Sequence, residues 1–289
     1  MTTLLSVPNF SEGRDPDQID AIARAFDAHL LDVHSDPDHH RAVATLAGAP
    51  GELAPAVLGG AREIVARVKL DRHEGEHPRI GALDVAPIVY LADGDRGAAC
   101  AEALVLGDLL GTELELPVFL YGELAAGRSR AELRRGGPRA LAERIDAGAL
   151  RPDFGPRRLH PTAGAALVGA RRPLIAFNVE LTAPASLADA KAIAAAIREG
   201  GEEGLASVRA IGLWLQSRGV AQVSMNIEDY RRTPLVEVVQ AIARHANIAE
   251  AELVGLAPRA AFEGFPSELN VRGLRTIEDA LAAASGPAH

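Results

Sequence analysis

The sequence predicts an α+β protein with mixed sheets, organised as two subdomains that cover residues 1–172 and 173–289. Apolar runs of strand length alternate along the chain with segments of helical periodicity, joined by short turns. This alternation is typical of layered folds that contain both helices and sheets. The stretch 150–172 interrupts it, because it is rich in Gly, Pro and Arg and shows no period. We therefore expect a long functional loop or connector there.

The helix expected at 52–68 illustrates how the elements of the first subdomain are assigned. Its apolar residues Leu53, Val57, Ala61 and Ile64 recur at the spacing that lines one face of a helix. Three other segments, 15–29, 95–111 and 129–146, are predicted as helices in the same region. Strands are predicted where the apolar run is short, at 3–7, 30–34, 42–47, 83–91 and 117–121.

The second subdomain begins with an apolar strand at 173–179. Further strands are predicted at 208–215, 221–227 and 251–256, and helices at 186–198, 233–247, 258–263 and 276–284. A glycine-rich segment at 200–204 reads as a loop between two of these elements.

Composition and charge exclude several classes of function. The formal net charge of −9 lacks the basic footprint that a nucleic-acid partner requires. No apolar run approaches the roughly 20 residues that span a bilayer, so no membrane association is expected. The N-terminus lacks the features of a signal peptide. A single cysteine, Cys100, suits a reducing compartment and reads as a small core residue, and we expect a cytoplasmic protein.

A polar segment ahead of the strand at 83–91 contains the letters of a zinc-protease motif. The run 73–77, H-E-G-E-H, matches H-E-x-x-H, in which two histidines one helical turn apart bind zinc. Gly75 disfavours the necessary helix by about 1 kcal/mol relative to alanine, and Pro78 biases His77 towards extended backbone. The sequence therefore predicts a loop, and a zinc hydrolase that uses His73 and His77 is the alternative.

The same loop is the centre of a resemblance that runs along nearly the whole chain. R-H-E-G-E-H-P-R-I-G-A-L-D-V-A-P at 72–87 resembles the signature of the formiminotransferase domain of glutamate formimidoyltransferases. Similar motifs occur in the family's order along the rest of the chain, at 7–14, 117–123, 153–156, 168–171, 174–178, 208–212, 221–226 and 253–256. The resemblance implies two ferredoxin-like subdomains with the active site in a cleft or tunnel between them. It also implies a homodimer.

The family's reaction moves a formimino group from N-formimino-L-glutamate to N5 of tetrahydrofolate, which is a co-substrate. By resemblance, His77 is the general base and acid of this reaction, and a histidine titrates in the range that both roles need. Glu76, Arg79 and Asp84 are candidates for supporting it, or are ordinary turn residues and solvated charges. A structural role for His77 as a loop histidine is the alternative that the residues alone would favour.

Both substrates are anionic, so arginines are candidate ligands for their carboxylates. Arg41 and Arg171 are the candidates that we name. The resemblance also implies a folate-binding stretch, which consists of Gly155, Pro156, Arg157, Arg158, Leu159, His160, Pro161, Thr162, Ala163 and Gly164. This stretch departs from the mammalian form, where a serine-rich segment with an aromatic residue stands.

A cluster of histidines and aspartates precedes Arg41. Its members are His34, Asp36, Asp38, His39 and His40. Such residues can bind a metal, but Asp and Pro are also typical of a tight turn between two strands. We predict no metal, and the side chains of His39 and Arg41 pointing towards a ligand are the other alternative.

Three rival functions differ from formimino transfer. One is the same chemistry with N-formylglutamate as the donor, which differs from the formimino donor at a single heteroatom. The others are a folate-binding relative that catalyses nothing and the zinc hydrolase. Because the chain has 289 residues, we expect a transferase without the cyclodeaminase domain of the bifunctional enzymes, with a separate cyclodeaminase downstream.

Overall fold

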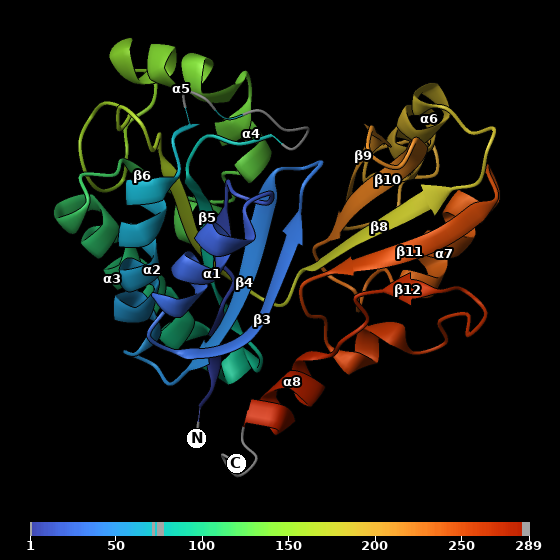
Figure 1. Ribbon diagram of the computed structural model, residues 1–289, viewed down its shortest axis with the longest axis horizontal. Helices are drawn as coiled ribbons and strands as arrows, with labels where there is room; N and C mark the ends of the chain where they lie inside the picture. Colours follow the sequence, from blue (N-terminus) through green and yellow to red (C-terminus); the bar gives the residue numbers. More distant parts are fainter. Residues whose placement is uncertain (1, 71–72, 74–77, 285–289) are drawn as a thin grey trace. The chain divides into compact units, whose positions relative to one another are not determined.

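Two separate sheets form the framework of the protein. Our computed structural model describes residues 2–70, 73 and 78–284 (Figure 1). It divides into two units, Met1–Arg171 and Arg172–His289, each with its own sheet and hydrophobic core. The expected α+β architecture with mixed sheets is confirmed.

The first sheet is built around a strand that Pro8 interrupts. Its halves, β1 (Leu4–Ser6) and β2 (Asn9–Phe10), pair antiparallel with both β4 (Arg41–Gly48) and β5 (Leu83–Tyr90). Strand β3 (His29–Asp36) pairs antiparallel with the other edge of β4. Helices α1 (Pro16–Arg24) and α2 (Leu53–Arg67) follow the first strand and β4 respectively. The resulting order βαββαβ is the ferredoxin-like motif.

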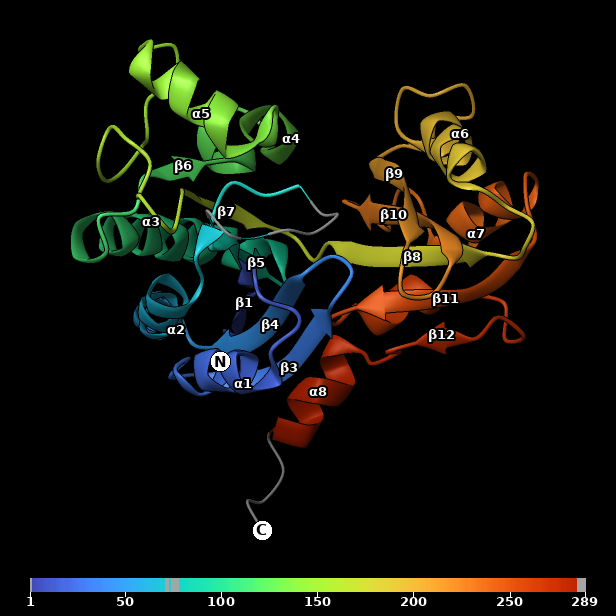
Figure 2. The ribbon, with the colours of Figure 1, turned by 45° about the horizontal axis from the view of Figure 1, so that its top comes forward.

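Two parallel strands extend this sheet beyond β5. The chain runs through α3 (Arg96–Glu113) to β6 (Val118–Leu120) and returns as β7 (Ala166–Arg171), which lies between β5 and β6. Helices α1, α2 and α3 cover one face of the sheet, while α4 (Arg130–Arg134) and α5 (Gly137–Asp146) cover the other face near β6 (Figure 2). Strand β5 is buried at every position for this reason.

Three expectations for the first unit are wrong in detail. The segment 129–146 forms two helices, because Gly136 and Gly137 adopt φ angles of +77° and +70° that end the first. Helix α1 ends at Arg24, and the chain then turns into β3. The connector expected at 150–172 contains β7, a run of small and apolar residues that is buried between two strands.

The second unit repeats the ferredoxin-like order. Its elements are β8 (Ile175–Leu181), α6 (Leu187–Ile197), β9 (Val208–Leu215), β10 (Val220–Ile227), α7 (Leu235–Ala243) and β11 (Ile248–Val254). The strands pair antiparallel in the order β11-β8-β10-β9, and β12 (Val271–Arg272) adds in parallel beside β11. The helix expected at 258–263 is a short 3₁₀ turn, Arg259–Phe262, and α8 (Ile277–Ala284) follows it.

The two faces of the second sheet differ in chemistry. Phe177, Val179 and Val223 belong to the core that α6 and α7 complete. Because side chains alternate along a strand, the intervening residues Asn178 and Gln222 lie on the opposite face, with 2% and 0% of their surface exposed. Among the residues that the structure describes, no helix is both long and apolar enough to cross a membrane.

Candidate active site

The two ends of the signature loop meet the expected folate-binding stretch. Ala82 N donates to Ala163 O at 2.8 Å and Ala165 N donates to Ile80 O at 3.0 Å, on the C-terminal side of the loop. On its N-terminal side, Leu70 N donates to Thr162 O at 2.8 Å. Residues 162–165 therefore lie against the backbone on both flanks of the signature loop.

Glycine makes the closest of these approaches possible. Gly81 and Gly164 form an antiparallel bridge. A Cβ at Gly81 would lie 1.9 Å from Ala165 O, and one at Gly164, whose φ is +70°, would lie 2.2 Å from Ile80 O. No real side chain tolerates such distances, so these glycines bring the two segments into contact.

His73 lies between an aromatic ring and a guanidinium. Its ring stacks on that of His40, with centroids 3.9 Å apart and planes inclined by 17°. His73 Nε2 lies 3.0 Å from His40 O, and Arg79 Nη1 contacts His73 Nδ1. Since a carbonyl only accepts and a guanidinium only donates, both contacts are made by the neutral ring that carries its proton on Nε2.

The surroundings of His73 oppose its protonation. Burial is the main cause, followed by the positive charge of Arg79 and by His40, and together they lower the pKa of His73 to about 4. The carboxylate of Glu12 and the bond to His40 O act in the opposite direction. At neutral pH the ring is therefore uncharged.

The turn between β3 and β4 presents His40 to this ring. His40 adopts a φ of +48°, a left-handed conformation that is uncommon for residues other than glycine. Its Nε2 lies 3.3 Å from Glu12 Oε1, which also accepts hydrogen bonds from the backbone of the loop after β2. A Cβ at Gly13 in that loop would lie 2.4 Å from Arg41 N. The loop and the turn are thus packed backbone to backbone.

A buried carboxylate fixes the residues that follow the loop. Asp84, at the start of β5, is 2% exposed and accepts a hydrogen bond from Ile80 N at 2.8 Å. Its other oxygen pairs with Arg134 of α4. Sequence reasoning missed Arg134, and the signal that could have found it is the arginine-rich run 128–135, which begins with the capping box of Ser129 and Glu132.

Arg41 lies in the same electrostatic environment. Burial is the main cause that lowers the pKa of Arg41 to about 10, followed by the positive charge of Arg134. Asp84 and Asp36 raise this pKa, while Arg130 lowers it further. The group stays charged at neutral pH, and it sits where an additional negative charge would stabilise it.

The rest of the expected folate-binding stretch has a mixed character. Gly155, with a φ of +77°, approaches Leu116 O so closely that a Cβ would lie 2.2 Å away. Arg157 and Arg158 are exposed. His160 Nδ1 accepts hydrogen bonds from the backbone of Thr162 and Ala163, and burial lowers its pKa. His160 therefore shapes the turn that precedes Gly164.

The structure describes some of the remaining candidate residues and not others. His77 and Glu76 lie outside the described residues. Arg171 ends β7 and is half-buried. His39 is 1% exposed, with Nδ1 3.7 Å from Asp36. Over residues 2–70, 73 and 78–284 no group of three potential metal-binding side chains was found.

Two family models match the chain in sequence order. The model described as "Formiminotransferase domain, N-terminal subdomain" matches residues 3–171, and that described as "Formiminotransferase domain" matches residues 176–264. Glutamate formimidoyltransferase of Thermoplasma acidophilum is 37% identical over 275 residues, which cover 90% of this chain and 90% of that protein. The chain belongs to the formiminotransferase family.

Other formiminotransferases extend the similarity. Glutamate formimidoyltransferase of Streptococcus pyogenes serotype M1 is 35% identical, over 87% of this chain and 88% of that protein. Formimidoyltransferase-cyclodeaminase of Sus scrofa is 41% identical, over 87% of this chain but 49% of that protein. The chain thus spans about half the length of the bifunctional relatives that it matches.

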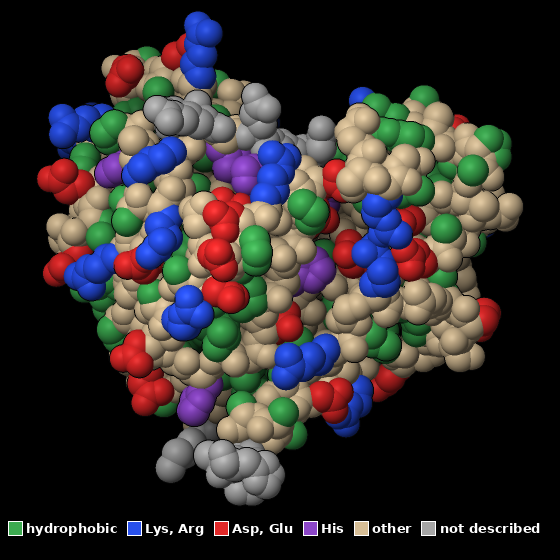
Figure 3. All heavy atoms as spheres, in the orientation of Figure 1, with side chains coloured by type: hydrophobic (Ala, Val, Ile, Leu, Met, Phe, Trp, Pro, Cys, Tyr) green, Lys and Arg blue, Asp and Glu red, His purple; other side chains and the backbone are tan. Residues whose placement is uncertain are grey.

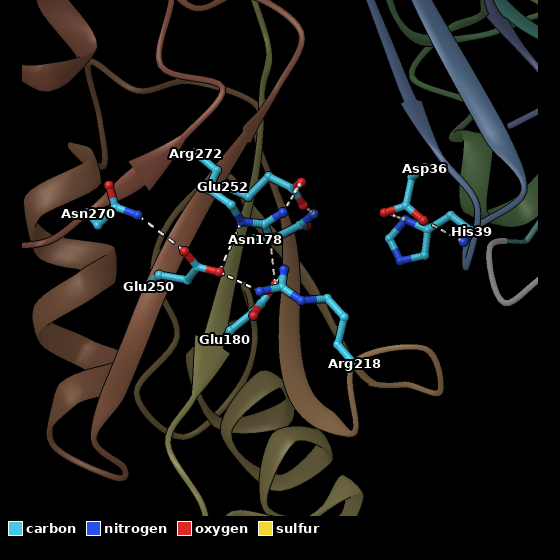
Figure 4. Close-up of polar contacts among 9 residues, drawn as sticks. All are labelled: Asp36, His39, Asn178, Glu180, Arg218, Glu250, Glu252, Asn270 and Arg272. Carbon is cyan, nitrogen blue, oxygen red and sulfur yellow. Dashed lines mark hydrogen bonds and ion pairs between the residues drawn. The ribbon is translucent and has the colours of Figure 1, made fainter. Parts of the chain in front are cut away.

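The second unit carries a polar network that the sequence did not reveal (Figure 4). Glu180 is 2% exposed, and its Oε1 accepts from Arg218 at 2.5 Å and from Arg272 at 2.6 Å. Arg272 also approaches Glu250 at 3.0 Å and Glu252 at 3.2 Å. Three carboxylates therefore share two guanidiniums.

Surface charge in this protein is mixed. The face visible in Figure 3 shows acidic and basic side chains interspersed. For a chain with a net charge of −9, binding of an anionic substrate requires a local concentration of positive charge. In the first unit, the positive charges of Arg130 and Arg134 act on Arg41, and Asp84 and Asp36 act in the opposite direction.

Proposed function

We propose that this protein is a glutamate formimidoyltransferase that moves the formimino group of N-formimino-L-glutamate to N5 of tetrahydrofolate. The observation that carries the proposal is the contact of residues 162–165 with both flanks of the signature loop. It occurs in a chain that is similar to glutamate formimidoyltransferases over about nine-tenths of both lengths. Tetrahydrofolate enters as a co-substrate, in the breakdown of histidine.

His77 is the general base and acid of the proposed reaction. The secondary amine N5 adds to the amidine carbon of the donor, and His77 takes the proton that N5 loses. The tetrahedral intermediate then collapses: the bond from carbon to the glutamate nitrogen breaks, and the same proton passes from His77 to that nitrogen. A positioned acid and base of this kind contributes roughly 10²- to 10⁴-fold to a rate.

Neighbouring side chains have supporting roles in this proposal. Asp84 orders the turn after the signature loop, since it already accepts from Ile80 N and pairs with Arg134. Arg79 ends the loop, and Glu76 is the candidate that orients the imidazole of His77. No step requires a metal, and both ring nitrogens of His73 have protein partners, which argues against a zinc site on that residue.

Charge supports the proposed substrate contacts within the first unit. Arg41 receives a substrate carboxylate, since its pKa is lowered mainly by burial and then by Arg134, and a carboxylate would relieve both effects. Arg171 is the second candidate. The stretch 155–164 binds the folate, with the exposed Arg157 and Arg158 available to its glutamate tail.

The proposal extends to the wider setting of the reaction. We propose a cytoplasmic homodimer, with residues 1–172 and 173–289 as the N-terminal and C-terminal formiminotransferase subdomains; the two compact units, Met1–Arg171 and Arg172–His289, divide one residue earlier. The relatives from Thermoplasma and Streptococcus match it over most of their length. In this setting the 5-formiminotetrahydrofolate product passes to a separate cyclodeaminase.

The test follows formation of 5-formiminotetrahydrofolate by absorbance with purified protein, tetrahydrofolate and formiminoglutamate. We expect turnover that survives EDTA and falls by about 10³-fold in His77→Ala. His29→Ala, which changes an exposed histidine of β3, is the matched control and should keep wild-type activity. If EDTA removes the activity and zinc restores it, the zinc hydrolase is the better interpretation. Absence of turnover would contradict the proposal.

A parallel assay with N-formylglutamate addresses the donor. The two donors differ only in O or NH at the transferred carbon. We expect kcat/KM to be higher with formiminoglutamate. The reverse order would assign the enzyme to formyl transfer.

A further inference from the structure

We propose that Thr45 and Tyr121 determine substrate specificity, and that their hydroxyls form hydrogen bonds with a substrate on the face of the first sheet opposite α1, α2 and α3. The inference rests on the proposed function, because the substrate is one of the two that react. All the residues that carry it belong to the first unit.

Two hydroxyls among the described residues are buried without a hydrogen-bond partner. They are Thr45 Oγ1 and Tyr121 Oη, in residues that are 2% and 5% exposed. Buried polar groups are nearly always paired, because removing a hydroxyl from water without giving it a partner is unfavourable. Since the folded chain supplies no partner, a bound molecule is the partner that we infer.

Both side chains lie on the same face of the first sheet. Ala44 and Leu46 belong to the core that α1, α2 and α3 complete. Thr45 lies between them on β4, so its side chain points to the opposite face. Tyr121 follows β6 and packs with Phe119 in the core of that opposite face.

A row of residues crosses the sheet from one hydroxyl to the other. The strand registers and the backbone hydrogen bonds beside them place Thr45, Val7, Pro87 and Gly169 next to one another. A Cβ at Gly169 would lie 3.0 Å from Tyr121 Cζ, so the hydroxyl-bearing end of the Tyr121 ring rests on this glycine. Neighbouring strands are about 4.8 Å apart, and the row from β4 to β7 therefore spans about 14 Å.

The middle of this row has no polar side chain. Val7 and Pro87 have only hydrocarbon side chains, and Gly169 has none. These residues cannot satisfy the hydroxyls at the two ends. A molecule that lies across them can reach both.

The Tyr121 end of the row is cationic. The guanidinium of Arg130 lies over the Tyr121 ring, 5.7 Å from its centroid. Arg171 lies two residues after Gly169 on β7 and therefore on the same face. A phenolic hydroxyl can donate to a carboxylate, and nearby guanidiniums stabilise that anion. The partner of the Tyr121 hydroxyl is therefore a substrate carboxylate.

The Thr45 end of the row is acidic. Asp32 of β3 is paired with Thr45, so the two side chains are neighbours on one face. An N–H donor suits this end, because both a carboxylate and a hydroxyl can accept from it. Formiminoglutamate and tetrahydrofolate both carry a carboxylate and N–H donors, and the experiment distinguishes between them.

Two substitutions remove only the hydroxyls. Tyr121→Phe should lower kcat/KM by about 10- to 100-fold, because it deletes a hydrogen bond to a charged group, and Thr45→Val should lower it by about fivefold. Neither should lower the midpoint of unfolding in urea, since no hydrogen bond within the protein is lost. Thr45→Ser keeps the hydroxyl and should keep kcat/KM.

The matched controls are buried hydroxyls that have partners. Tyr90 Oη donates to Glu123 at 2.7 Å and Thr233 Oγ1 donates to Ala206 O at 2.6 Å, and both residues are 2% exposed. Tyr90→Phe and Thr233→Val should show the opposite pattern, with a lower urea midpoint and a kcat/KM within about twofold of wild type.

The pattern of KM values identifies the substrate. A raised KM for formiminoglutamate in Tyr121→Phe assigns the carboxylate to the donor, and a raised KM for tetrahydrofolate assigns it to the glutamate tail. Wild-type kcat/KM in both Tyr121→Phe and Thr45→Val would overturn the inference. A urea midpoint lowered as in the controls would also overturn it, because the hydroxyl would then have a partner within the folded protein.

Binding without turnover separates this inference from the proposed function. Each substrate is titrated alone in a calorimeter, so that no transfer takes place. We expect Tyr121→Phe to bind one of them at least about tenfold more weakly than wild type or Tyr90→Phe. This result supports the inference even if wild type transfers no formimino group. Turnover by wild type with equal binding in all three proteins, or no binding of either substrate by wild type, would overturn it.

Discussion

The polar network around Arg218 in the second unit and the cluster around Arg41 and His73 in the first unit differ in how their charges are stabilised. In the second unit, the hydrogen bond between Arg218 and Glu250 raises the pKa of the arginine and lowers that of the carboxylate, so each stabilises the charged form of the other. In the first unit, burial and neighbouring cations lower the pKa values of both His73 and Arg41. The Arg218–Glu250 pair is therefore stabilised in its charged form, although burial raises the pKa of the neighbouring Glu180, whereas burial and the charge of Arg134 oppose the charged form of Arg41.

This difference separates a structural network from a candidate binding site. Three carboxylates already surround Arg218 and Arg272, so a substrate carboxylate would have to displace one of them. Around Arg41, burial and then the positive charges of Arg134 and Arg130 lower the pKa, while Asp84 and Asp36 raise it. An anionic substrate is therefore expected at the first cluster.

The largest effect is expected at the ion pair that borders the first cluster. Arg134→Met removes the partner of Asp84, and the side chains of this pair are only 14% and 3% exposed. Loss of one member of a buried pair costs about 3–5 kcal/mol of unfolding free energy, because the remaining charge is left uncompensated. Denaturation in urea measures this cost.

A second substitution checks the cause of that cost. Asp84→Asn in the Arg134→Met background removes the stranded charge, and part of the stability should return. A single variant that unfolds at the wild-type midpoint would mean that Asp84 finds another partner. The contrast between the two clusters would then be weaker than the structure indicates.

A smaller effect is expected at the centre of the second cluster. Glu180→Gln should cost about 1 kcal/mol, because weaker hydrogen bonds to Arg218 and Arg272 are partly offset by the smaller cost of burying a neutral group. Burial is the main cause that raises the pKa of Glu180, against the two arginines. Activity of Glu180→Gln should stay near that of wild type, and a loss of more than about tenfold would place this cluster in the catalytic site.

The raised pKa of Glu180 makes the stability of the protein depend on pH. A raised pKa means that the folded protein holds the Glu180 proton more tightly than the unfolded chain. The stability that this provides is complete below the unfolded value of 4.5 and is lost as the pH rises through the folded pKa. Glu180→Gln should remove this part of the pH dependence when unfolding is measured across the mildly acidic range.

The smallest effect is a slope of opposite sign from His73. Its pKa falls from 6.5 to about 4 on folding, so between these values the unfolded chain binds the additional proton. Stability from this group is complete above pH 6.5 and decreases as the pH falls towards 4. The difference in unfolding free energy between wild type and His73→Phe should therefore decrease as the pH falls from 6.5 to 4. A difference that stays constant over this range would contradict an uncharged ring.

The amino-acid sequence by itself determined the order of most helices and strands and the motifs that indicate the family. Alternating periods identified most strands and helices, and the motifs at 72–87 and 153–156 indicated the family before any contact was known. Local pattern was sufficient there, because helical and strand periods depend on residues a few positions apart. Pattern failed for β7, where small residues buried on both faces leave no alternation to detect.

Only the tertiary structure decided the partners of the site. His40 and His73 are 33 positions apart in the sequence, and Asp84 and Arg134 are 50 positions apart. Gly81 and Gly164 form an isolated antiparallel bridge outside the named strands. Neither the stack nor the ion pair leaves a periodic trace in the sequence, since each depends on how β4, β5 and α4 pack. The pKa shifts of His73 and Arg41 depend on the same packing, because burial is their first cause.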